Sequence, residues 1–194
     1  EIGEAQAMKI ITPSQFTSTR WKNGAGTTRE ITRQIGPKGY CWRLSIAKVI
    51  RDETFSTFPG MSRILTVIEG NGMALHANEQ TQDAAHNTPV SFAGAIPVAG
   101  RLYDGPVQNF NVIYDPHLIA ADVQILVAGR ARILAARPVR TYAVYCLRGI
   151  LEINGTYLDC GSIALIDHKE VQLKIPEKSL GLRVQLDALD LVKP

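Results

Sequence analysis

The sequence contains few cysteines, and their spacing argues against a disulfide scaffold. Cys41, Cys146 and Cys160 are odd in number among 194 residues, and no two of them form a Cys-x-x-Cys pair. Such cysteine usage is typical of a reduced, cytoplasmic compartment. Cys146 and Cys160 can meet across a hairpin, but two buried small hydrophobic side chains explain them as well, and we expect buried thiols.

Long apolar runs are also lacking, which argues against a membrane protein. No run approaches the roughly 18 residues that a membrane-spanning helix needs, and no signal-peptide pattern precedes the first strand pattern. The seven residues before Met8, EIGEAQA, have the character of an expression-tag remnant at positions 1–7. We therefore expect a cytoplasmic protein that has no membrane partner.

Charge of one sign is not concentrated along the chain, which argues against a nucleic-acid-binding protein. The 21 Lys and Arg residues outnumber the 18 Asp and Glu residues only slightly, and the formal net charge is +3. The positive residues are spread out, and the aromatic residues, 7% of the total, do not interleave with them. A nucleic-acid surface would need both features together, so we expect no nucleic-acid partner.

The sequence does contain a series of short strand patterns separated by glycine turns. Apolar residues make up 45% of the chain, enough for one domain or two small fused halves. WRLSIAKVI alternates Trp42 and Leu44 with Arg43 and Ser45, which is typical of a half-buried strand. Residues 63–75 predict a hairpin with a Gly-Asn-Gly turn. Further strands are predicted within 87–94, 100–105, 108–115, 141–168 and 180–189.

A weak internal repeat divides the chain into two parts. ILTVIEGNGMAL (64–75) parallels YAVYCLRGILEI (142–153), since each has an apolar strand, a charged residue, a glycine and a returning strand. Two fused β-barrels of the jelly-roll type leave such a repeat. We predict an all-β fold of two fused barrels, the first over residues 8–115 and a second, smaller one over 116–194.

Polar side chains recur on one face of several predicted strands. Arg43 and Ser45 share a face of one strand, Asn109 and Asn111 share a face of another, and Arg63 begins a third. Buried Arg and Asn are costly unless they are paired, so this pattern favours a wet, ligand-holding cavity. Arg offers a planar fork that matches a carboxylate, and Asn offers both a donor and an acceptor.

Structural explanations for the same residues stay open. Arg43 and Arg63 can face solvent, or pair with Glu30 and Glu69 in a buried network. The simpler roles for other candidates are strand positions for Thr27, Thr28 and Ser45, core positions for Trp21 and Trp42, and a rigid turn at a cavity rim for residues 58–60.

Four motifs, in the order in which they occur along the chain, resemble one known family. WKNGAGTTREI (21–31), WRLSIAKV (42–49), FSTFPGMSRILTVIEGNG (55–72) and DGPVQNFNVIYD (104–115) together resemble the HutD/Ves family of bicupin proteins. The resemblance implies two cupin-type barrels, a small-anion pocket in the N-terminal barrel, and a role in histidine utilisation that involves a formylated glutamate. The residues that match motif positions are Asn23, Thr28, Arg29, Glu30, Arg43, Arg63, Asn109 and Asn111, and Ser45 joins them as a neighbour of Arg43.

The chain lacks the histidines that a metal-dependent cupin needs. Enzymatic cupins hold a transition metal with a His-x-His pair, a downstream Glu and a later His. The pair should fall on FSTFPGMS (55–62), which contains no histidine. The histidines of the chain are His76, His86, His117 and His168, all of them elsewhere and far apart. We therefore predict no metal and no cofactor, and the lack of a Gly-x-Ser-x-Gly elbow removes one common nucleophile as well.

These observations favour a metal-free bicupin that binds a small carboxylate metabolite, such as formate or a formylglutamate-like acid. A sensor or accessory role in amino-acid catabolism fits that hypothesis. The alternative is an isomerase or hydrolase that uses Glu30 or Glu69 with an Arg, or a metal at a non-standard site. Cupins also associate through their sheets, so a homodimer is a further alternative.

The opening motif WKNGAGTTREIT (21–32) is not predicted to be a phosphate loop, because no helix pattern follows its glycines. Gly24 and Gly26 instead turn the chain into a strand. The family pattern has a glycine where Ala25 stands, and a positive φ there would strain the alanine. Whether the polar residues of this motif face the cavity or brace its rim stays open.

Overall fold

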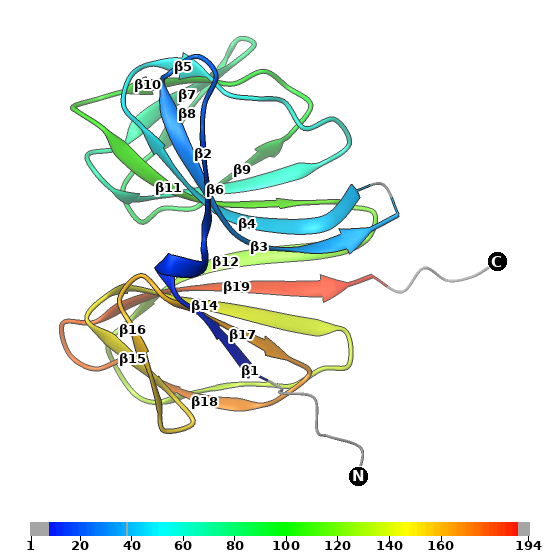
Figure 1. The fold of residues 1–194 in the computed structure, drawn as a ribbon, viewed down its shortest axis with the longest axis vertical. Helices are drawn as coiled ribbons and strands as arrows, with labels where there is room; N and C mark the ends of the chain where they lie inside the picture. The colour runs from blue at the N-terminus through cyan, green and yellow to red at the C-terminus, as the bar shows by residue number, and fades with distance from the viewer. Residues whose placement is uncertain (1–7, 38, 190–194) are drawn as a thin grey trace. The chain divides into compact units, whose positions relative to one another are not determined.

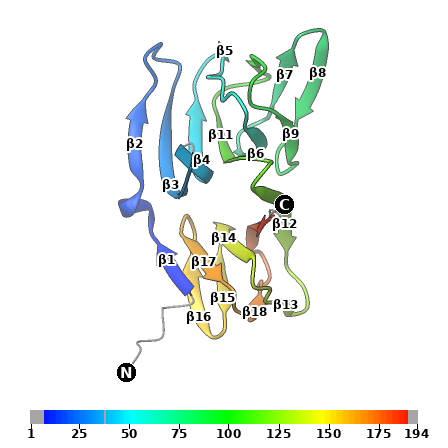
Figure 2. The same cartoon turned by 90° about the vertical axis from the view of Figure 1, so that its right-hand side faces the viewer.

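The computed structural model describes residues 8–37 and 39–189, so the expected tag remnant lies outside the described residues. The described chain is built from strands β1 to β19, with a single short 3-10 turn, η1 (Pro13–Gln15), before β2. Residue contacts divide it into two units, which we call the N-terminal unit (16–119) and the C-terminal unit (8–15 and 120–189). Figures 1 and 2 show the strands of each unit. The predicted all-β class is confirmed.

The N-terminal unit consists of two antiparallel sheets with an apolar core between them. Its core includes Leu65 and Val67 from one sheet and Met73 and Leu75 from the other. The six-stranded sheet has the order β2 (Thr17–Arg20), β3 (Gly26–Gly36), β4 (Gly39–Val49), β11 (Val107–Tyr114), β6 (Ser62–Glu69) and β9 (Val90–Ala93). The four-stranded sheet has the order β5 (Glu53–Thr54), β10 (Ala99–Leu102), β7 (Met73–Ala77) and β8 (Gln80–Ala84).

The C-terminal unit also consists of two antiparallel sheets. Its apolar core includes Val144, Leu151, Ile166 and Leu173. The five-stranded sheet has the order β1 (Met8–Ile11), β17 (Ile163–Asp167), β14 (Arg140–Arg148), β19 (Leu180–Ala188) and β12 (Ile119–Val127). The four-stranded sheet has the order β13 (Arg132–Leu134), β18 (Val171–Lys174), β15 (Ile150–Ile153) and β16 (Thr156–Asp159).

The two units share one strand order. The run β4-β11-β6-β9 recurs as β12-β19-β14-β17, and β5-β10-β7-β8 recurs as β13-β18-β15-β16, with every label raised by eight. Each unit adds edge strands to this common set, β2 and β3 in the N-terminal unit and β1 in the C-terminal unit. The weak repeat in the sequence therefore corresponds to a repeated topology.

The hairpin predicted at residues 63–75 is wrong. β6 pairs with β11 and β9, whereas β7 pairs with β10 and β8, so the chain passes from one sheet to the other between them. Gly70 and Gly72 have φ values of 97° and 85°, so the positive φ inferred from the sequence serves a corner between sheets. Gly149 makes the equivalent corner between β14 and β15.

The boundary between the units also differs from the predicted one. The predicted division lies at residue 115, whereas the contacts divide the chain after Ile119. β1 precedes the N-terminal unit in sequence, yet it pairs antiparallel with β17 of the C-terminal unit. Met8 and Ile10 pack against the apolar core of that unit, which explains why this strand joins it.

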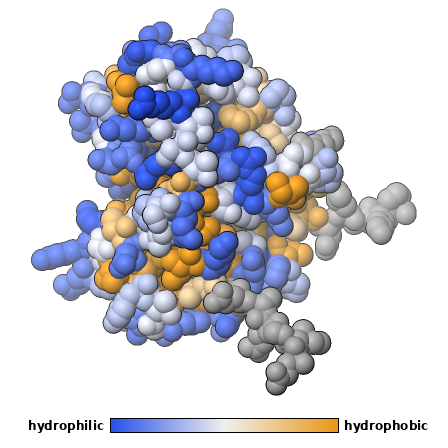
Figure 3. Space-filling model, in the orientation of Figure 1, coloured by the Kyte–Doolittle hydropathy of each residue, from blue (hydrophilic) through white to orange (hydrophobic). Residues whose placement is uncertain are grey.

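Hydrophilic side chains cover much of the face shown in Figure 3, with smaller hydrophobic patches between them. The described residues contain no helix with the length and apolar character needed to cross a membrane. All three cysteines are free thiols. The prediction of buried thiols is right for Cys146, whereas Cys41 is partly buried and Cys160 is exposed.

Candidate functional site

A cavity of about 490 Å³ lies within the N-terminal unit. Most of its lining comes from the six-stranded sheet, and the rest comes from the segments around residues 21–23 and 54–58. The lining residues are Thr19, Arg20, Trp21, Lys22, Asn23, Thr28, Arg43, Ser45, Ala47, Thr54, Phe55, Ser56, Phe58, Arg63, Leu65, Asn109, Asn111 and Ile113. They include four cations and no carboxylate, so the cavity is suited to an anion.

The register of β4, β11 and β6 brings the polar residues of the lining together. Residues that are opposite each other in neighbouring strands point to the same side of a sheet. Three such rows cover the cavity side, and in the order β4, β11, β6 they are Ala47-Asn109-Val67, Ser45-Asn111-Leu65 and Arg43-Ile113-Arg63. The next row beyond the first contains the buried pair Val49 and Val107. The interior of the unit thus changes from apolar to polar along these strands.

Arg63 is a buried cation surrounded by aromatic rings. Its relative exposure is 8%. The Cζ atom of its guanidinium lies 4.9 Å from the ring centre of Phe92, 5.2 Å from that of Phe58 and 6.0 Å from that of Phe55. Its Nη1 donates to the carbonyl oxygen of Ser56 at 3.3 Å. The rings and this hydrogen bond hold the planar guanidinium in one orientation at the cavity wall.

No carboxylate among the described residues forms an ion pair with Arg63. Burial lowers the pKa of Arg63 to about 10, and the nearby positive charge of Arg43 adds to this lowering. Arg63 is still protonated at neutral pH. It is therefore a positive charge without a counter-ion, next to a cavity.

Several buried polar atoms of the lining have no hydrogen-bond partner within the described residues. They are Nε of Arg43 and Arg63 and Oδ1 of Asn109 and Asn111. The Nδ2 atom of Asn111 makes only a long hydrogen bond, 3.5 Å, to the carbonyl oxygen of Asn109. Buried polar groups are almost always satisfied by protein, water or ligand, because leaving them unpaired costs about 1–3 kcal/mol each. The clustering of these donors and acceptors indicates a site for a polar guest.

Arg43 differs from Arg63 because it has a carboxylate beside it. Its Nε lies 2.7 Å from Oε1 of Glu30, although the angle is too poor for a hydrogen bond. Glu30 also accepts two hydrogen bonds from the guanidinium of Arg33, at 2.5 and 3.0 Å. Of the two pairings considered from the sequence, the one with Glu30 is present. Glu69 instead accepts a hydrogen bond from Gln108 and does not line the cavity.

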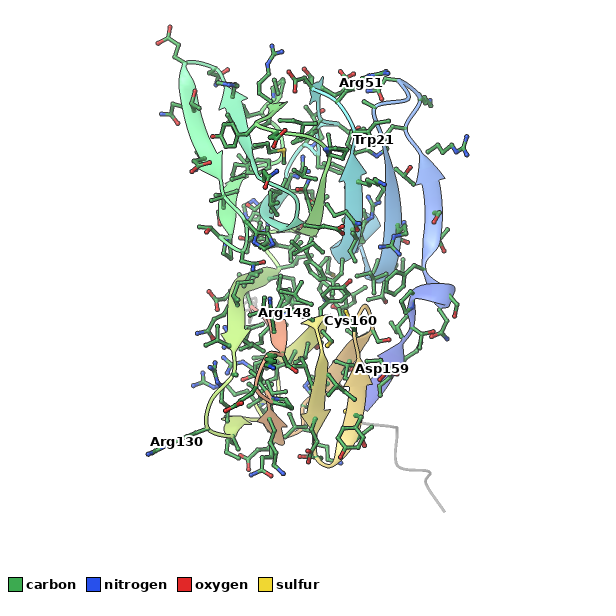
Figure 4. The ribbon with its side chains drawn as sticks, turned by 90° about the vertical axis from the view of Figure 1, so that its left-hand side faces the viewer. Trp21, Arg51, Arg130, Arg148, Asp159 and Cys160 are labelled. Carbon is green, nitrogen blue, oxygen red and sulfur yellow. The ribbon has the colours of Figure 1, made fainter. Side chains whose placement is uncertain are left out.

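The opening loop forms another part of the cavity wall. Trp21 donates from Nε1 to Oγ1 of Thr28 at 2.8 Å, and its ring meets that of Phe55 edge to face at 6.2 Å. Oδ1 of Asn23 accepts from the backbone nitrogen of Ala25, while the guanidinium of Arg51 donates to the carbonyl oxygen of Asn23. Figure 4 shows Trp21 and Arg51 at the same end of the unit.

The loop glycines explain why Ala25 is tolerated. The positive φ falls on Gly24, at 72°, and Ala25 is not among the residues with positive φ. Ala25 is fully buried instead. The strain considered for an alanine at this position is therefore absent.

The structure brings together most of the predicted site residues. Those that line the cavity are Asn23, Thr28, Arg43, Ser45, Arg63, Asn109 and Asn111. Arg29 is opposite Ile46 in register, and its guanidinium lies 5.6 Å from the ring centre of Phe16, outside the lining. Glu30 does not line the cavity either, but it contacts Arg43 from the same face of the sheet. It therefore braces the wall.

Sequence reasoning missed the cations Arg20 and Lys22, both of which line the cavity. They flank Trp21, with Arg20 directly before the opening motif and Lys22 inside it, and β2 pairs with β3 at this point. A strand signal in TSTR (17–20) would have revealed Arg20. Phe58 was considered only as part of a turn at the rim, and it lines the cavity next to Arg63.

The donor set of the lining does not suit a transition metal. It contains no histidine, cysteine or carboxylate. Across the described residues, no group of three or more His, Cys, Asp or Glu side chains could hold a metal ion. The chemistry that the lining offers is recognition by cations, amides, hydroxyls and aromatic rings.

Comparisons with known proteins identify relatives of the whole chain. The HutD family model matches residues 13–182. A Pseudomonas putida protein, described as an uncharacterized 21.2 kDa protein in the hutC 3′ region, is 31% identical over 181 residues, which cover 92% of this chain and 93% of that protein. The structure of HutD from Pseudomonas fluorescens SBW25 (formate condition) matches with a TM-score of 0.83 and 29% identity, over 94% of this chain and 100% of that one.

A more distant likeness establishes the fold class. A cupin 2 conserved barrel domain protein from Leptotrichia buccalis, 11% identical, matches with a TM-score of 0.57 over 92% of this chain and 96% of that one. The fold is thus of the all-β cupin class. The family match covers both units, and the hutC neighbourhood of the relative links the family to histidine utilisation. This chain belongs to the HutD family.

Proposed function

We propose that the cavity of the N-terminal unit binds a small carboxylate metabolite. On this proposal the protein is a metal-free cytoplasmic bicupin that acts as a sensor or accessory factor in histidine catabolism. The single observation that carries the proposal is Arg63, a buried guanidinium that lacks a carboxylate partner and has an unsatisfied Nε at the cavity wall. A carboxylate fits this group because it accepts two parallel hydrogen bonds from the guanidinium fork.

The rest of the lining is consistent with a ligand that has further polar groups. Asn109 and Asn111 have unsatisfied amide oxygens, which accept hydrogen bonds from an amide or hydroxyl of a guest. A volume of about 490 Å³ falls in the usual range for small-molecule sites and leaves room for a metabolite larger than formate. A formylglutamate-like acid has both the carboxylate and the additional polar groups.

Two of the similar proteins also support the proposal. The HutD structure from Pseudomonas fluorescens carries the description "formate condition", and formate is the smallest carboxylate. The relative from Pseudomonas putida is described by its position at hutC. The repeated strand order supports the bicupin assignment, in which each unit is one cupin-type barrel.

The composition of the lining favours binding over catalysis. Histidine, cysteine, aspartate and glutamate, which often serve as general bases or nucleophiles, are missing from it, so its serines have no general base of these types in the lining to activate them. A binding protein needs only the complementary charges and hydrogen bonds that this cavity has.

The test is titration of the protein with formate, acetate, glutamate and N-formylglutamate. Binding is measured by calorimetry and by the change in melting temperature. We expect at least one carboxylate to raise the melting temperature, and its uncharged amide to have no such effect. Arg63→Met should weaken that binding by roughly 10- to 150-fold, because one hydrogen-bonded charge contributes about 1.5–3 kcal/mol. Methionine retains an unbranched apolar side chain between the rings, so the fold should persist.

The matched control is Arg29→Met, the same exchange on a strand of the same sheet but outside the cavity. This variant should bind the carboxylate as the wild type does. Arg63→Lys keeps the charge but loses the fork, so it should bind with intermediate affinity. Failure of every acid to bind, or full binding by a folded Arg63→Met variant, would contradict the proposal.

A further inference from the structure

Glu30 lies on the cavity side of its sheet, and an irregularity in β3 brings Arg33 to the same side. Residues 30 and 33 of a regular strand point to opposite faces, because side chains alternate. Glu30 is opposite Ser45 in the regular part of the pairing with β4. The pairing shifts between Glu30 and Thr32, and this β-bulge puts Arg33 opposite Arg43. Both therefore lie on the face that carries the cavity. Bulges often re-aim side chains next to functional sites.

The bulge lets two arginines, Arg43 and Arg33, share the carboxylate of Glu30. The Oε1 atom of Glu30 lies 2.7 Å from Nε of Arg43 and 2.5 Å from Nη2 of Arg33. The side chains of Arg43 and Glu30 are 19% and 21% exposed, so water screens this pair only partly. Arg33 is 43% exposed, and it fixes the carboxylate from the solvent side.

The two cavity arginines therefore present different charges to a ligand. Arg43 and Arg63 flank Ile113 in one row, two strand spacings apart, or about 10 Å between their backbones. Arg63 is an uncompensated cation. Arg43 has an Nε–H that makes no hydrogen bond, and the charge of Glu30, which it shares with Arg33, offsets part of its own. The other cations of the lining, Arg20 and Lys22, are exposed, so water screens them.

We propose that Glu30 sets the ligand specificity of the cavity by offsetting part of the charge of Arg43. The site then accepts one carboxylate at Arg63 and an uncharged acceptor, such as an amide or formyl oxygen, at Arg43. A second carboxylate at Arg43 meets the negative charge of Glu30 and is disfavoured. This inference rests on the proposed carboxylate site and adds the chemical class of the group at its second anchor. Glu30 acts through Arg43 and is a positioning residue.

The experiment compares glutarate with its monoamide, glutaramate, two probes of matched length that differ in one charge. Calorimetric titration should find that the wild type binds glutaramate more tightly than glutarate. Glu30→Gln keeps the size of the side chain and removes its charge. It should change the ratio of the two dissociation constants by about tenfold or more in favour of glutarate, because it removes a nearby negative charge that water screens only partly.

Two further variants separate this effect from general charge and from folding. Glu69→Gln makes the same change in net charge at a carboxylate outside the lining, and it should leave the ratio at its wild-type value. Glu30→Asp keeps the charge but draws it back from Arg43, and it should give an intermediate ratio. A purely structural role for Glu30 would weaken both probes alike and leave their ratio unchanged.

The outcomes distinguish this inference from the proposed function. If wild type binds carboxylates through Arg63 but Glu30→Gln leaves the ratio unchanged, the role of Glu30 is overturned and the carboxylate site stands. Equal binding of the two probes by wild type overturns it as well. If neither probe nor any smaller carboxylate binds to wild type, both proposals fail together.

Discussion

At the scale of single residues, Arg63 combines a cost for folding with a capacity for binding. A buried charge without a counter-ion destabilises the folded state, because it loses its hydration without gaining an ion pair. Burial lowers the pKa of Arg63 to about 10, and this lowered pKa reflects the cost of burying the charged form. The rings of Phe55, Phe58 and Phe92 offset part of it by cation–π attraction. An anion in the cavity would remove the remainder, which is why the cost is informative about function.

This balance predicts the stability of the ligand-free Arg63→Met variant. Methionine fills the space between the rings and carries no charge, so the free energy of unfolding should equal that of wild type or exceed it by about 1–2 kcal/mol. Urea denaturation of both proteins without ligand measures the difference. A loss of more than about 1 kcal/mol would mean that the aromatic contacts outweigh the cost of burying the charge. Addition of a bound carboxylate should reverse the order of the two stabilities.

At the scale of strands, the sequence predicts the site where the strands are regular. β4 and the part of β11 from Asn109 onward keep a period of two, so counting residues correctly assigns Arg43 and Asn111 to one face. β3 contains a bulge, and the count fails beyond it. Arg29 precedes the bulge and belongs by register on the other face, although its motif match indicated the cavity, whereas Arg33 follows the bulge and lies on the cavity face. A bulge adds one residue without a sequence signal that a period of two can detect.

Long-range pairing limits sequence prediction in a second way. The glycines at positions 70 and 149 indicate a positive φ, and both have one. Whether such a glycine closes a hairpin or turns a corner between two sheets depends on which strands pair later in the chain. The same limit applies to β1, whose partner β17 lies about 150 residues further along. Local patterns predict the strands, and non-local pairing decides their neighbours.

Strand β10 of the four-stranded sheet supports the cavity wall, and this predicts the effect of a single methyl group. A Cβ atom at Gly100 would lie 2.5 Å from Cζ of Phe55, whose ring meets both Trp21 and Arg63. Gly100→Ala should therefore push this ring toward the cavity. We expect a loss of about 1–3 kcal/mol in the free energy of unfolding and weaker carboxylate binding.

The control for this prediction is Gly129→Ala, where an added Cβ has no neighbour within 4 Å. It should change stability by less than about 0.5 kcal/mol and leave binding unaltered. Denaturant titration and calorimetry of the two variants provide the comparison. Wild-type affinity in a folded Gly100→Ala variant would show that Phe55 can move without affecting the ligand.

At the scale of the whole molecule, one topology serves two purposes. When the corner glycines Gly70 and Gly149 are aligned, Arg63 of β6 corresponds to Tyr142 of β14, and Leu65 corresponds to Val144. Tyr142 and Val144 belong to the apolar core of the C-terminal unit, which has no polar lining of this kind in the part of the chain that is described. At this repeated position the N-terminal unit has an arginine that lines a polar cavity, and the C-terminal unit has a tyrosine that belongs to an apolar core cluster.

This division of roles predicts where a ligand protects the chain. Hydrogen exchange measured with and without a bound carboxylate should slow in β4, β6 and β11 and in residues 19–23, because these segments line the cavity. Amides of β14 and β19 should exchange at the same rate in both states. These strands do not line the cavity, and they belong to the unit whose apolar core includes Val144. The Arg63→Met variant, treated with the same acid, should lose the protection in the N-terminal unit. Equal slowing of β14 and β19 by the ligand would contradict the assignment of binding to one unit, and would indicate either a second site or stabilisation of the chain as a single cooperative body.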